Sequence, residues 1–265
     1  MELNYREMGS GPPLIILHGL FGTLDNWATI GRRLSDEFLV WLVDLRNHGR
    51  SPHAAQHDYP AMAEDLRAFM ENHWMFDGAA VMGHSMGGKV AMQLALTYPE
   101  LVQKLIVVDI APRRYQDHHS HIIQALLELH PETLPDREAA EAKLAQTIAD
   151  PAVRQFLLKN LTRRKEGGYE FKMNLQALHK HYDDILAPVH GKRPYEGPTL
   201  FIKGELSPYI QPEDEQSIRQ LFPRAEIRTV KGAGHWVHAD QPDALLDLVR
   251  HFLLAEEHTA GAQKP

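Results

Sequence analysis

A serine between glycines is the residue whose setting most clearly predicts chemistry. Residues 83–88 read GHSMGG, which contains the spacing G-x-S-x-G, and they stand between an apolar run and a stretch of helical period. A sharp strand-to-helix turn of this kind exposes a serine hydroxyl and needs glycine where a side chain would collide. We therefore predict Ser85 as a nucleophile. A glycine-rich phosphate turn is the alternative, although the segment has neither G-x-G-x-x-G nor a Walker lysine in register.

A serine hydroxyl is a weak nucleophile at neutral pH and needs a base, which is usually histidine. Of the 17 histidines, His235 lies in the segment GAGHW at 232–236, just after the last predicted strand and near the C-terminus. This position matches the chain order serine, acid, histidine. We predict His235 as the general base.

Two backbone N–H groups are expected to stabilise the oxyanion of a tetrahedral intermediate. The first is the N–H of Met86, which follows the nucleophile at the start of a predicted helix. The second must come from another loop, and residues 18–22, HGLFG, directly follow the first core strand. We assign the second donor to the N–H of Leu20, with the N–H of Phe21 as the alternative. An ordinary glycine-containing turn is the remaining interpretation of this loop.

Short apolar runs alternate with stretches of helical period on both sides of these residues. Runs rich in valine, isoleucine and leucine, separated by helices, are typical of a parallel sheet buried on both faces, with ligands at the carboxyl ends of its strands. The fold class is therefore α/β with a mostly parallel, doubly wound sheet. We predict strands at 13–17, 38–45, 79–83, 104–110, 198–204 and 226–230. We predict core helices at 25–35, 59–73, 88–98, 212–222 and 242–255.

The strand pattern stops after Pro112 and returns at Pro198, and the residues between them form a predicted insertion. With 265 residues, the chain is long enough for one large domain or for a core with an insertion, and we expect the second. Residues 259–265 are small and polar, and we expect a flexible tail there. Within the insertion, charged stretches of helical period occur at 118–130, 137–149, 151–161 and 174–185.

The composition excludes several classes of protein. The formal charge of −7 disfavours a protein that neutralises nucleic-acid phosphates or anionic lipid. The absence of cysteine excludes disulfides, thiolate metal ligands and a cysteine nucleophile. The first residues, MELNYREMGSGPP, carry charges where a secretory signal is apolar, and no apolar run reaches about 18 residues. We therefore expect a cytoplasmic protein with no membrane span and no nucleic-acid partner.

Together these segments resemble the α/β-hydrolase family over nearly the whole chain. Residues 44–51, DLRNHGRS, resemble the family loop Asp-x-x-Gly-x-Gly-x-Ser, with Asn47 where a glycine is usual. The resemblance implies an α/β-hydrolase core at 1–112 and 197–258. It also implies that residues 113–196 form a helical cap that lies over the active site and shapes substrate access.

The acid is where this chain departs from the usual family pattern. The family acid commonly follows the strand after the cap, but there residues 204–209 read GELSPY, with Ser207 where an aspartate is expected. A serine does not carry the charge that stabilises an imidazolium. The other family position is the end of the strand after the nucleophile helix, so we assign Asp109 as the acid. Glu205 is the competing acid, and a helix N-cap is the other interpretation of Asp109. Ser207 is expected to hydrogen-bond His235 or Asp109 in a four-member network.

The motifs together resemble a bacterial esterase subgroup that acts on short-chain acyl esters and acyl-CoA thioesters. The resemblance implies a cofactor-free serine carboxylesterase, with thioesterase activity as a further expectation and a small acyl ester or thioester as its partner. A C–C bond hydrolase, a perhydrolase and a ligand-sensing protein that retains the triad are the alternatives, because one fold hosts many functions.

Several further features have a structural and a functional interpretation. Residues 117–121, DHHSH, and the pair His235 and His238 have spacings found among metal ligands. We interpret residues 117–121 as the polar start of a helix. His235 is already needed as the base, so we expect no metal at either place. The basic segment 163–165 is either a solvated turn or a contact for CoA phosphates. Aromatic and apolar side chains near the predicted loops and cap either line an acyl pocket or pack a core: Trp27, Phe156, Leu157, Leu161, Phe171, Leu175, Leu178 and Trp236.

Overall fold

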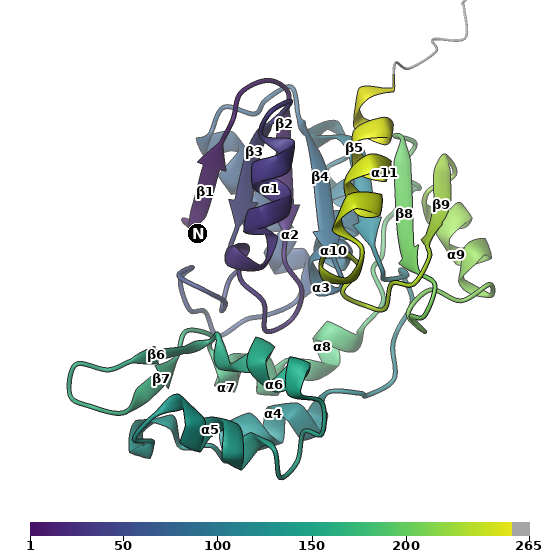
Figure 1. Ribbon diagram of the computed structural model, residues 1–265. Helices are drawn as coiled ribbons and strands as arrows, with labels where there is room; N and C mark the ends of the chain where they lie inside the picture. The colour runs from purple at the N-terminus through teal and green to yellow at the C-terminus, as the bar shows by residue number, and fades with distance from the viewer. Residues whose placement is uncertain (256–265) are drawn as a thin grey trace, which may run out of the picture.

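The computed structural model describes residues 1–255, which form a sheet with helices on both faces and a further group of helices beyond one end of the sheet (Figure 1). The tail predicted at 259–265 and the last three residues assigned to the core, 256–258, lie outside the described residues. Within residues 1–255, no helix is long and apolar enough to cross a membrane.

The central sheet confirms the predicted α/β class. Its strands are β1 (Tyr5–Met8), β2 (Pro13–Leu17), β3 (Leu39–Val43), β4 (Ala79–His84), β5 (Val102–Val108), β8 (Thr199–Gly204) and β9 (Ala225–Val230). In the described part of the chain the seven strands have the order β1-β3-β2-β4-β5-β8-β9. β1 pairs antiparallel with β3, whereas all other neighbours are parallel. The edge strand β1 was not among the predicted strands.

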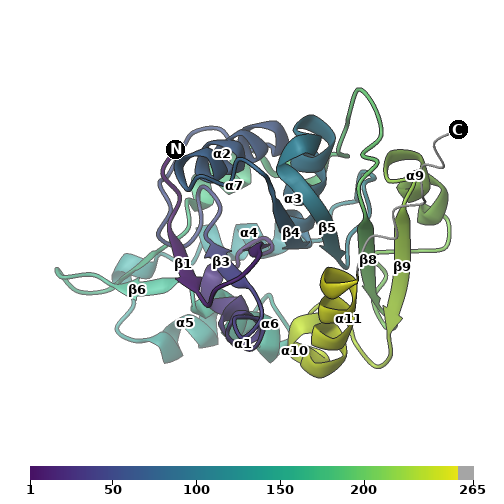
Figure 2. The ribbon, with the colours of Figure 1, turned by 90° about the horizontal axis from the view of Figure 1, so that it is seen from above.

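Alternate residues of the parallel strands face two separate apolar layers. In β2, Ile15 and Leu17 belong to one buried cluster, and Leu14 and Ile16 belong to the other. Because successive side chains of a strand point to opposite faces, a run of apolar residues needs cover on both sides. Helices α2 (Tyr59–Asn72) and α3 (Met86–Thr97) cover one face, and α1 (Ala28–Leu34) and α11 (Pro242–Leu254) cover the other (Figure 1, Figure 2). The remaining helices of the core are η1 (Leu24–Trp27), η2 (Pro99–Leu101), α9 (Asp214–Leu221) and α10 (Val237–Asp240).

The inserted segment lies beyond the carboxyl ends of the parallel strands, as Figure 1 shows. Its elements are α4 (Ser120–Leu127), η3 (Pro131–Thr133), α5 (Arg137–Leu144), α6 (Pro151–Leu158), β6 (Leu161–Arg163), β7 (Tyr169–Phe171), α7 (Leu175–Lys180) and α8 (Tyr182–Leu186). Between the helical stretches predicted at 151–161 and 174–185, β6 and β7 pair as an antiparallel hairpin that was not predicted. Three-residue strands with polar residues are too short for an alternating pattern to reveal them. The segment therefore adds a mainly helical layer where loops from several core strands meet.

Candidate active site

Ser85 lies in a strained turn between β4 and α3. It directly precedes Met86, the first residue of α3, and has φ 53° and ψ −121°. A Cβ on Gly83 would lie 2.1 Å from the carbonyl oxygen of Gly87, and a Cβ on Gly87 would lie 2.4 Å from the carbonyl oxygen of His18. Only glycine permits such close approaches of backbone. The two glycines therefore allow the sharp turn that presents the serine.

The ring of His235 is bonded to a buried carboxylate from a distant part of the chain. Asp109 directly follows β5, His235 lies in the loop after β9, and Nδ1 of His235 is 2.7 Å from Oδ2 of Asp109. Asp109 is fully buried, and its Oδ1 accepts a hydrogen bond from the N–H of Gly204 at 2.9 Å. Because an ionised carboxylate only accepts, the contact assigns the proton to Nδ1 of His235. Nε2 is then left with a lone pair.

The structure distinguishes between Asp109 and Glu205, the two carboxylates that the sequence offers as the acid. Ser207 donates from Oγ to Oδ2 of Asp109, which is one of the two contacts expected for this serine. The N–H of Tyr209 donates to Ser207 Oγ at 3.3 Å and so helps to orient the hydroxyl. Glu205 is exposed, and its Oε2 accepts from the N–H of Gly232 at 2.9 Å. The structure thus brings Asp109, and not Glu205, to the ring of His235.

Two aromatic rings pack against the ring of His235. Tyr209 stacks on the His235 ring with centroids 3.9 Å apart and an interplanar angle of 16°. The ring centroid of His84 lies 4.7 Å from that of His235, and Nε2 of His84 is 2.8 Å from the carbonyl oxygen of His235. Sequence reasoning did not single out Tyr209 or His84. The segments SPY and GHS contain them beside Ser207 and Ser85, so adjacency to a chosen residue was the available signal.

The backbone of the loop after β2 distinguishes the two N–H groups proposed for the oxyanion. The N–H of Phe21 donates to Nε2 of His48 at 3.3 Å, and Nδ1 of His48 is 3.0 Å from the carbonyl oxygen of Arg46. His48 can satisfy both contacts only as a neutral ring that donates from Nδ1 and accepts at Nε2. Burial lowers the pKa of His48 well below its ordinary value of 6.5, which agrees with this neutral form. Leu20, Phe21 and Met86 all line one cavity, but the N–H of Phe21 is already engaged with His48, which favours the N–H of Leu20 as the donor.

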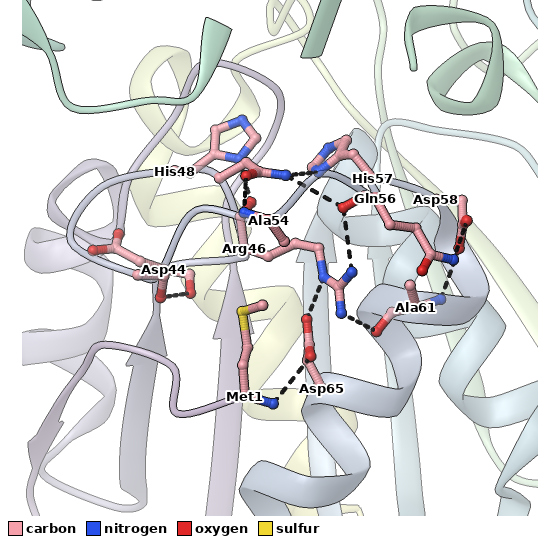
Figure 3. Close-up of polar contacts among 12 residues, drawn as sticks. Met1, Asp44, Arg46, His48, Ala54, Gln56, His57, Asp58, Ala61 and Asp65 are labelled. Atoms are coloured by element: carbon pink, nitrogen blue, oxygen red, sulfur yellow. Dashed lines mark hydrogen bonds and ion pairs between the residues drawn. The ribbon is translucent and has the colours of Figure 1, made fainter. Parts of the chain in front are cut away.

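The loop that carries His48 is braced by a buried ion pair. Nε of Arg46 lies 2.5 Å from Oδ2 of Asp65 in α2, and the ammonium of Met1 lies 3.3 Å from the other carboxylate oxygen (Figure 3). A further guanidinium N–H donates to the carbonyl oxygen of Ala61 at 3.1 Å. These contacts fix the backbone whose carbonyl group orients His48.

A cavity of about 450 Å³ connects the groups described above. Ser85, Met86, Leu20 and His235 all line it, whereas Asp109 lies behind His235 and is fully buried. The volume is within the range of about 300–1,000 Å³ that small-molecule sites occupy. Apolar or aromatic side chains that line the cavity include Trp27, Ile122, Val153, Phe156, Leu157 and Trp236. Other apolar candidates from the insertion pack in the buried cluster or against it instead, namely Leu161, Phe171, Leu175 and Leu178.

The histidines around His235 are held neutral. Burial lowers the pKa of His84 well below 6.5, and positive charge on His235 or His238 lowers it further. Burial and the nearby His235 also lower the pKa of His119 and that of His238, each to about 4. His235, in contrast, has its ring bonded to the carboxylate of Asp109. In the part of the chain that the structure describes, no group of three or more His, Asp or Glu side chains could hold a metal ion.

Comparisons with known proteins give a consistent result. Residues 12–242 match the family model described as the alpha/beta hydrolase fold. The chain is 36% identical over 260 residues to esterase YbfF of Escherichia coli, covering 96% of this chain and 99% of the relative. It is 40% identical over 250 residues to the sn-1-specific diacylglycerol lipase ABHD11 of Mus musculus, covering 91% and 81%. A solved structure described as a marine microorganism esterase matches with a TM-score of 0.92 and 43% identity, covering 95% of this chain and 99% of that one.

Proposed function

Because the chain belongs to the alpha/beta hydrolase fold family and is a hydrolase that acts on ester bonds, we propose that it is a serine carboxylesterase that uses an acyl-enzyme. Ser85 is the nucleophile, His235 the general base and acid, and Asp109 the acid that orients His235. The observation that carries this proposal is the 2.7 Å contact between Nδ1 of His235 and the buried carboxylate of Asp109. His235 and Ser85 line the same cavity.

In the first half of the reaction, Nε2 of His235 takes the proton of the Ser85 hydroxyl as Oγ attacks the substrate carbonyl carbon. The carbonyl oxygen becomes an oxyanion, which the N–H groups of Met86 and Leu20 stabilise. Met86 opens α3, so its N–H is among those that have no partner within the helix. The bond to the leaving alcohol or thiol then breaks, and His235 returns its proton to that group.

In the second half, water attacks the acyl-enzyme while His235 takes one of its protons. The bond between the acyl group and Ser85 breaks, the serine recovers its proton from His235, and the carboxylic acid leaves. Asp109 holds His235 in the tautomer with the free Nε2 and stabilises the ring when it is charged. Ser207 acts as a positioning residue, because it orients the carboxylate and carries no charge itself.

The inserted segment supplies the remaining parts of the proposal. We take residues 113–196 as a cap whose apolar side chains, among them Phe156 and Leu157, contact the acyl group. The β6–β7 hairpin contains Arg163 at the end of β6 and Arg164 and Lys165 in the turn that follows, and these side chains carry the positive charge that CoA phosphates require. Acyl-CoA thioesters are therefore proposed substrates beside oxygen esters.

The proposal is tested by initial hydrolysis rates on p-nitrophenyl esters from acetate to palmitate and on the matched acyl-CoA thioesters. We expect turnover that is lost in Ser85→Ala and kept in Ser10→Ala, since Ser10 is exposed and lies in the first turn of the chain. The rate profile then reports the acyl length that the cavity accepts. Turnover that survives in Ser85→Ala, or no turnover on either series, contradicts the proposal.

A further inference from the structure

A buried lysine lines the same cavity, one helical turn from the nucleophile. The N–H of Lys89 donates to the carbonyl oxygen of Ser85 at 3.1 Å, so both residues lie on one face of the start of α3. Lys89 is 1% exposed and contributes to the wall of the cavity. Helical side chains point back toward the N-terminus, which directs Lys89 toward the level of the nucleophile.

The neighbours of the Lys89 ammonium are neutral or positively charged. Nζ is 2.6 Å from the carbonyl oxygen of Ala187, and it lies 4.9 Å and 5.4 Å from the ring centroids of Tyr115 and Tyr59. Burial, together with the positive charges of Arg113 and Arg114, lowers the pKa of Lys89 to about 7. Among the ion pairs found within residues 1–255, none includes Lys89.

Hydrogen bonds to the end of the inserted segment do not by themselves explain why position 89 is a lysine. The carbonyl oxygens of Leu186, at 3.4 Å, and Ala187 accept from Nζ, but a neutral amide donor can satisfy carbonyl groups as well. A buried cation without an anion carries a desolvation cost that hydrogen bonds to carbonyl groups only partly offset. An ammonium has three donors, so one N–H remains beyond these two contacts.

From this geometry we infer that Lys89 forms a subsite for a carboxylate at the far end of the substrate acyl group. The inference rests on the proposed function, because it names the class of acyl group that the same site accepts: the half-esters of short dicarboxylic acids. The scissile carbonyl lies at Ser85, and a substrate carboxylate at Nζ supplies the negative charge that the described residues around Lys89 lack.

The helix sets the length of the acyl chain. Lys89 is four positions after Ser85, which corresponds to about 6 Å along a helix, and its side chain points back toward Ser85, so the substrate carboxylate lies within about one helical turn of the nucleophile. A linker of about two to four methylene groups spans a comparable distance, on the order of one helical turn. Succinate, glutarate and adipate half-esters therefore cover the expected range.

The test compares monoethyl glutarate with ethyl valerate, which have equal chain lengths and release the same alcohol. We expect wild-type kcat/KM to be higher for monoethyl glutarate by about 10-fold or more, the scale of a buried charge pair. Monoethyl succinate and monoethyl adipate then define the preferred linker. Equal or lower kcat/KM for all three half-esters overturns the inference, and turnover of ethyl valerate in that case leaves the proposed function intact.

Variants separate a charge effect from a packing effect. Lys89→Gln keeps a donor for the carbonyl groups and removes the charge, and we expect it to lower the ratio of the two kcat/KM values by about 10-fold. Lys89→Arg keeps the charge and is expected to retain a preference for the half-ester. Lys180→Met is the control, because Lys180 is exposed in the last turn of α7 and its loss should not move the ratio. If Lys89→Gln slows both substrates by the same factor, Lys89 has only a structural role.

A binding measurement decides the inference independently of turnover. Titration calorimetry of Ser85→Ala with monoethyl glutarate and with ethyl valerate is expected to give tighter binding of the half-ester, and Lys89→Gln added to this variant removes the difference. Equal binding of the two ligands contradicts the subsite. If neither ethyl ester is hydrolysed by the wild type, the p-nitrophenyl and acyl-CoA series still decide the proposed function, and this titration decides the role of Lys89.

Discussion

Ser207 donates its hydroxyl hydrogen to Oδ2 of Asp109, the same carboxylate oxygen that lies 2.7 Å from Nδ1 of His235. With the N–H of Gly204 on Oδ1, the buried carboxylate accepts three hydrogen bonds. The loop after β8, which commonly carries the acid in this family, thus contributes a hydroxyl that supports a carboxylate from the loop after β5.

Replacing Asp109 tests the assignment of the acid. Asp109→Asn retains the size of the side chain but removes the charge and favours the wrong tautomer of His235, so we expect kcat to fall on the order of 10⁴-fold. Glu205→Gln is the control and should change kcat by less than about threefold, because Glu205 contacts the backbone of Gly232. Steady-state kinetics on a p-nitrophenyl ester measures both. Near-full activity of Asp109→Asn removes Asp109 from the triad.

Replacing Ser207 tests its role as a positioning residue. Ser207→Ala removes one of three hydrogen bonds to the carboxylate and leaves its charge, so we expect kcat to fall by about 10-fold, the scale of one hydrogen bond to a charged group. The change should fall on kcat with a smaller effect on KM, because Ser207 contacts the carboxylate and is not among the residues that line the cavity. A loss larger than that of Asp109→Asn contradicts the network.

The oxyanion loop has a direct contact with the inserted segment. The buried amide of Asn160 donates from Nδ2 to the carbonyl oxygen of Phe21 at 2.7 Å, so both ends of the Phe21 residue are held, by Asn160 and by His48. We expect Asn160→Ala to lower kcat by about 10-fold with a smaller effect on KM, since loss of a whole oxyanion donor costs about 10²–10³-fold.

The control for that experiment is Gln155→Ala. Gln155 is exposed in α6 and contacts Glu141 of the same segment, so its loss should leave kcat within about twofold. Thermal melting of both variants checks that the fold is retained. An Asn160→Ala enzyme whose kcat matches that of Gln155→Ala shows that the contact does not position the loop.

Buried histidines make stability depend on pH. Burial, with the charge of Arg46, lowers the pKa of His57 from 6.5 to about 3, and burial lowers that of His238 to about 4. Below about pH 6.5 the unfolded chain therefore binds protons that the folded protein does not. Stability is fully present above pH 6.5 and falls as the pH drops below it, by up to about 1.4 kcal/mol per pH unit for each such histidine.

Thermal melting between pH 7 and pH 4.5 measures this dependence. We expect the melting temperature to fall steadily with pH, and His57→Gln to reduce the slope. His251→Gln, at an exposed position in α11, is the control and should keep the wild-type slope. An unchanged slope in His57→Gln contradicts the assignment of a neutral buried ring to His57.

Local sequence was sufficient to predict the parallel strands and the sharp turn that carries Ser85. The sequence predicted the six parallel strands within a few residues, and five of them are nearly continuous apolar runs because they are buried on both faces. The edge strand β9 is the exception, since it is mostly exposed or half-buried. Two kinds of element escaped prediction. Tyr5–Met8 forms an edge strand that is largely exposed, and the hairpin strands at 161–163 and 169–171 are short, so neither has a long apolar run.

The site was predictable where a residue has a motif and not where its role depends on the path of a distant segment. Ser85 and His235 stand in recognisable spacings, and the resemblance to the family pointed to Asp109, because Ser207 stands where the usual acid is expected. The predicted helix at 151–161 placed Asn160 on a helix, whereas α6 ends at Leu158, so that Asn160 is free to reach Phe21. Its partner lies 139 residues away, and no local pattern specifies such a contact.

The most direct test of the central claim is the covalent labelling of the nucleophile. Wild-type protein, Ser85→Ala and Ser10→Ala are treated with diethyl p-nitrophenyl phosphate, and the intact proteins and their peptides are weighed by mass spectrometry. We expect one diethylphosphoryl group on the peptide that contains Ser85, in the wild type and in Ser10→Ala, and none in Ser85→Ala. A label at another residue, or equal labelling of Ser85→Ala, would contradict the claim that Ser85 is the activated nucleophile of this hydrolase.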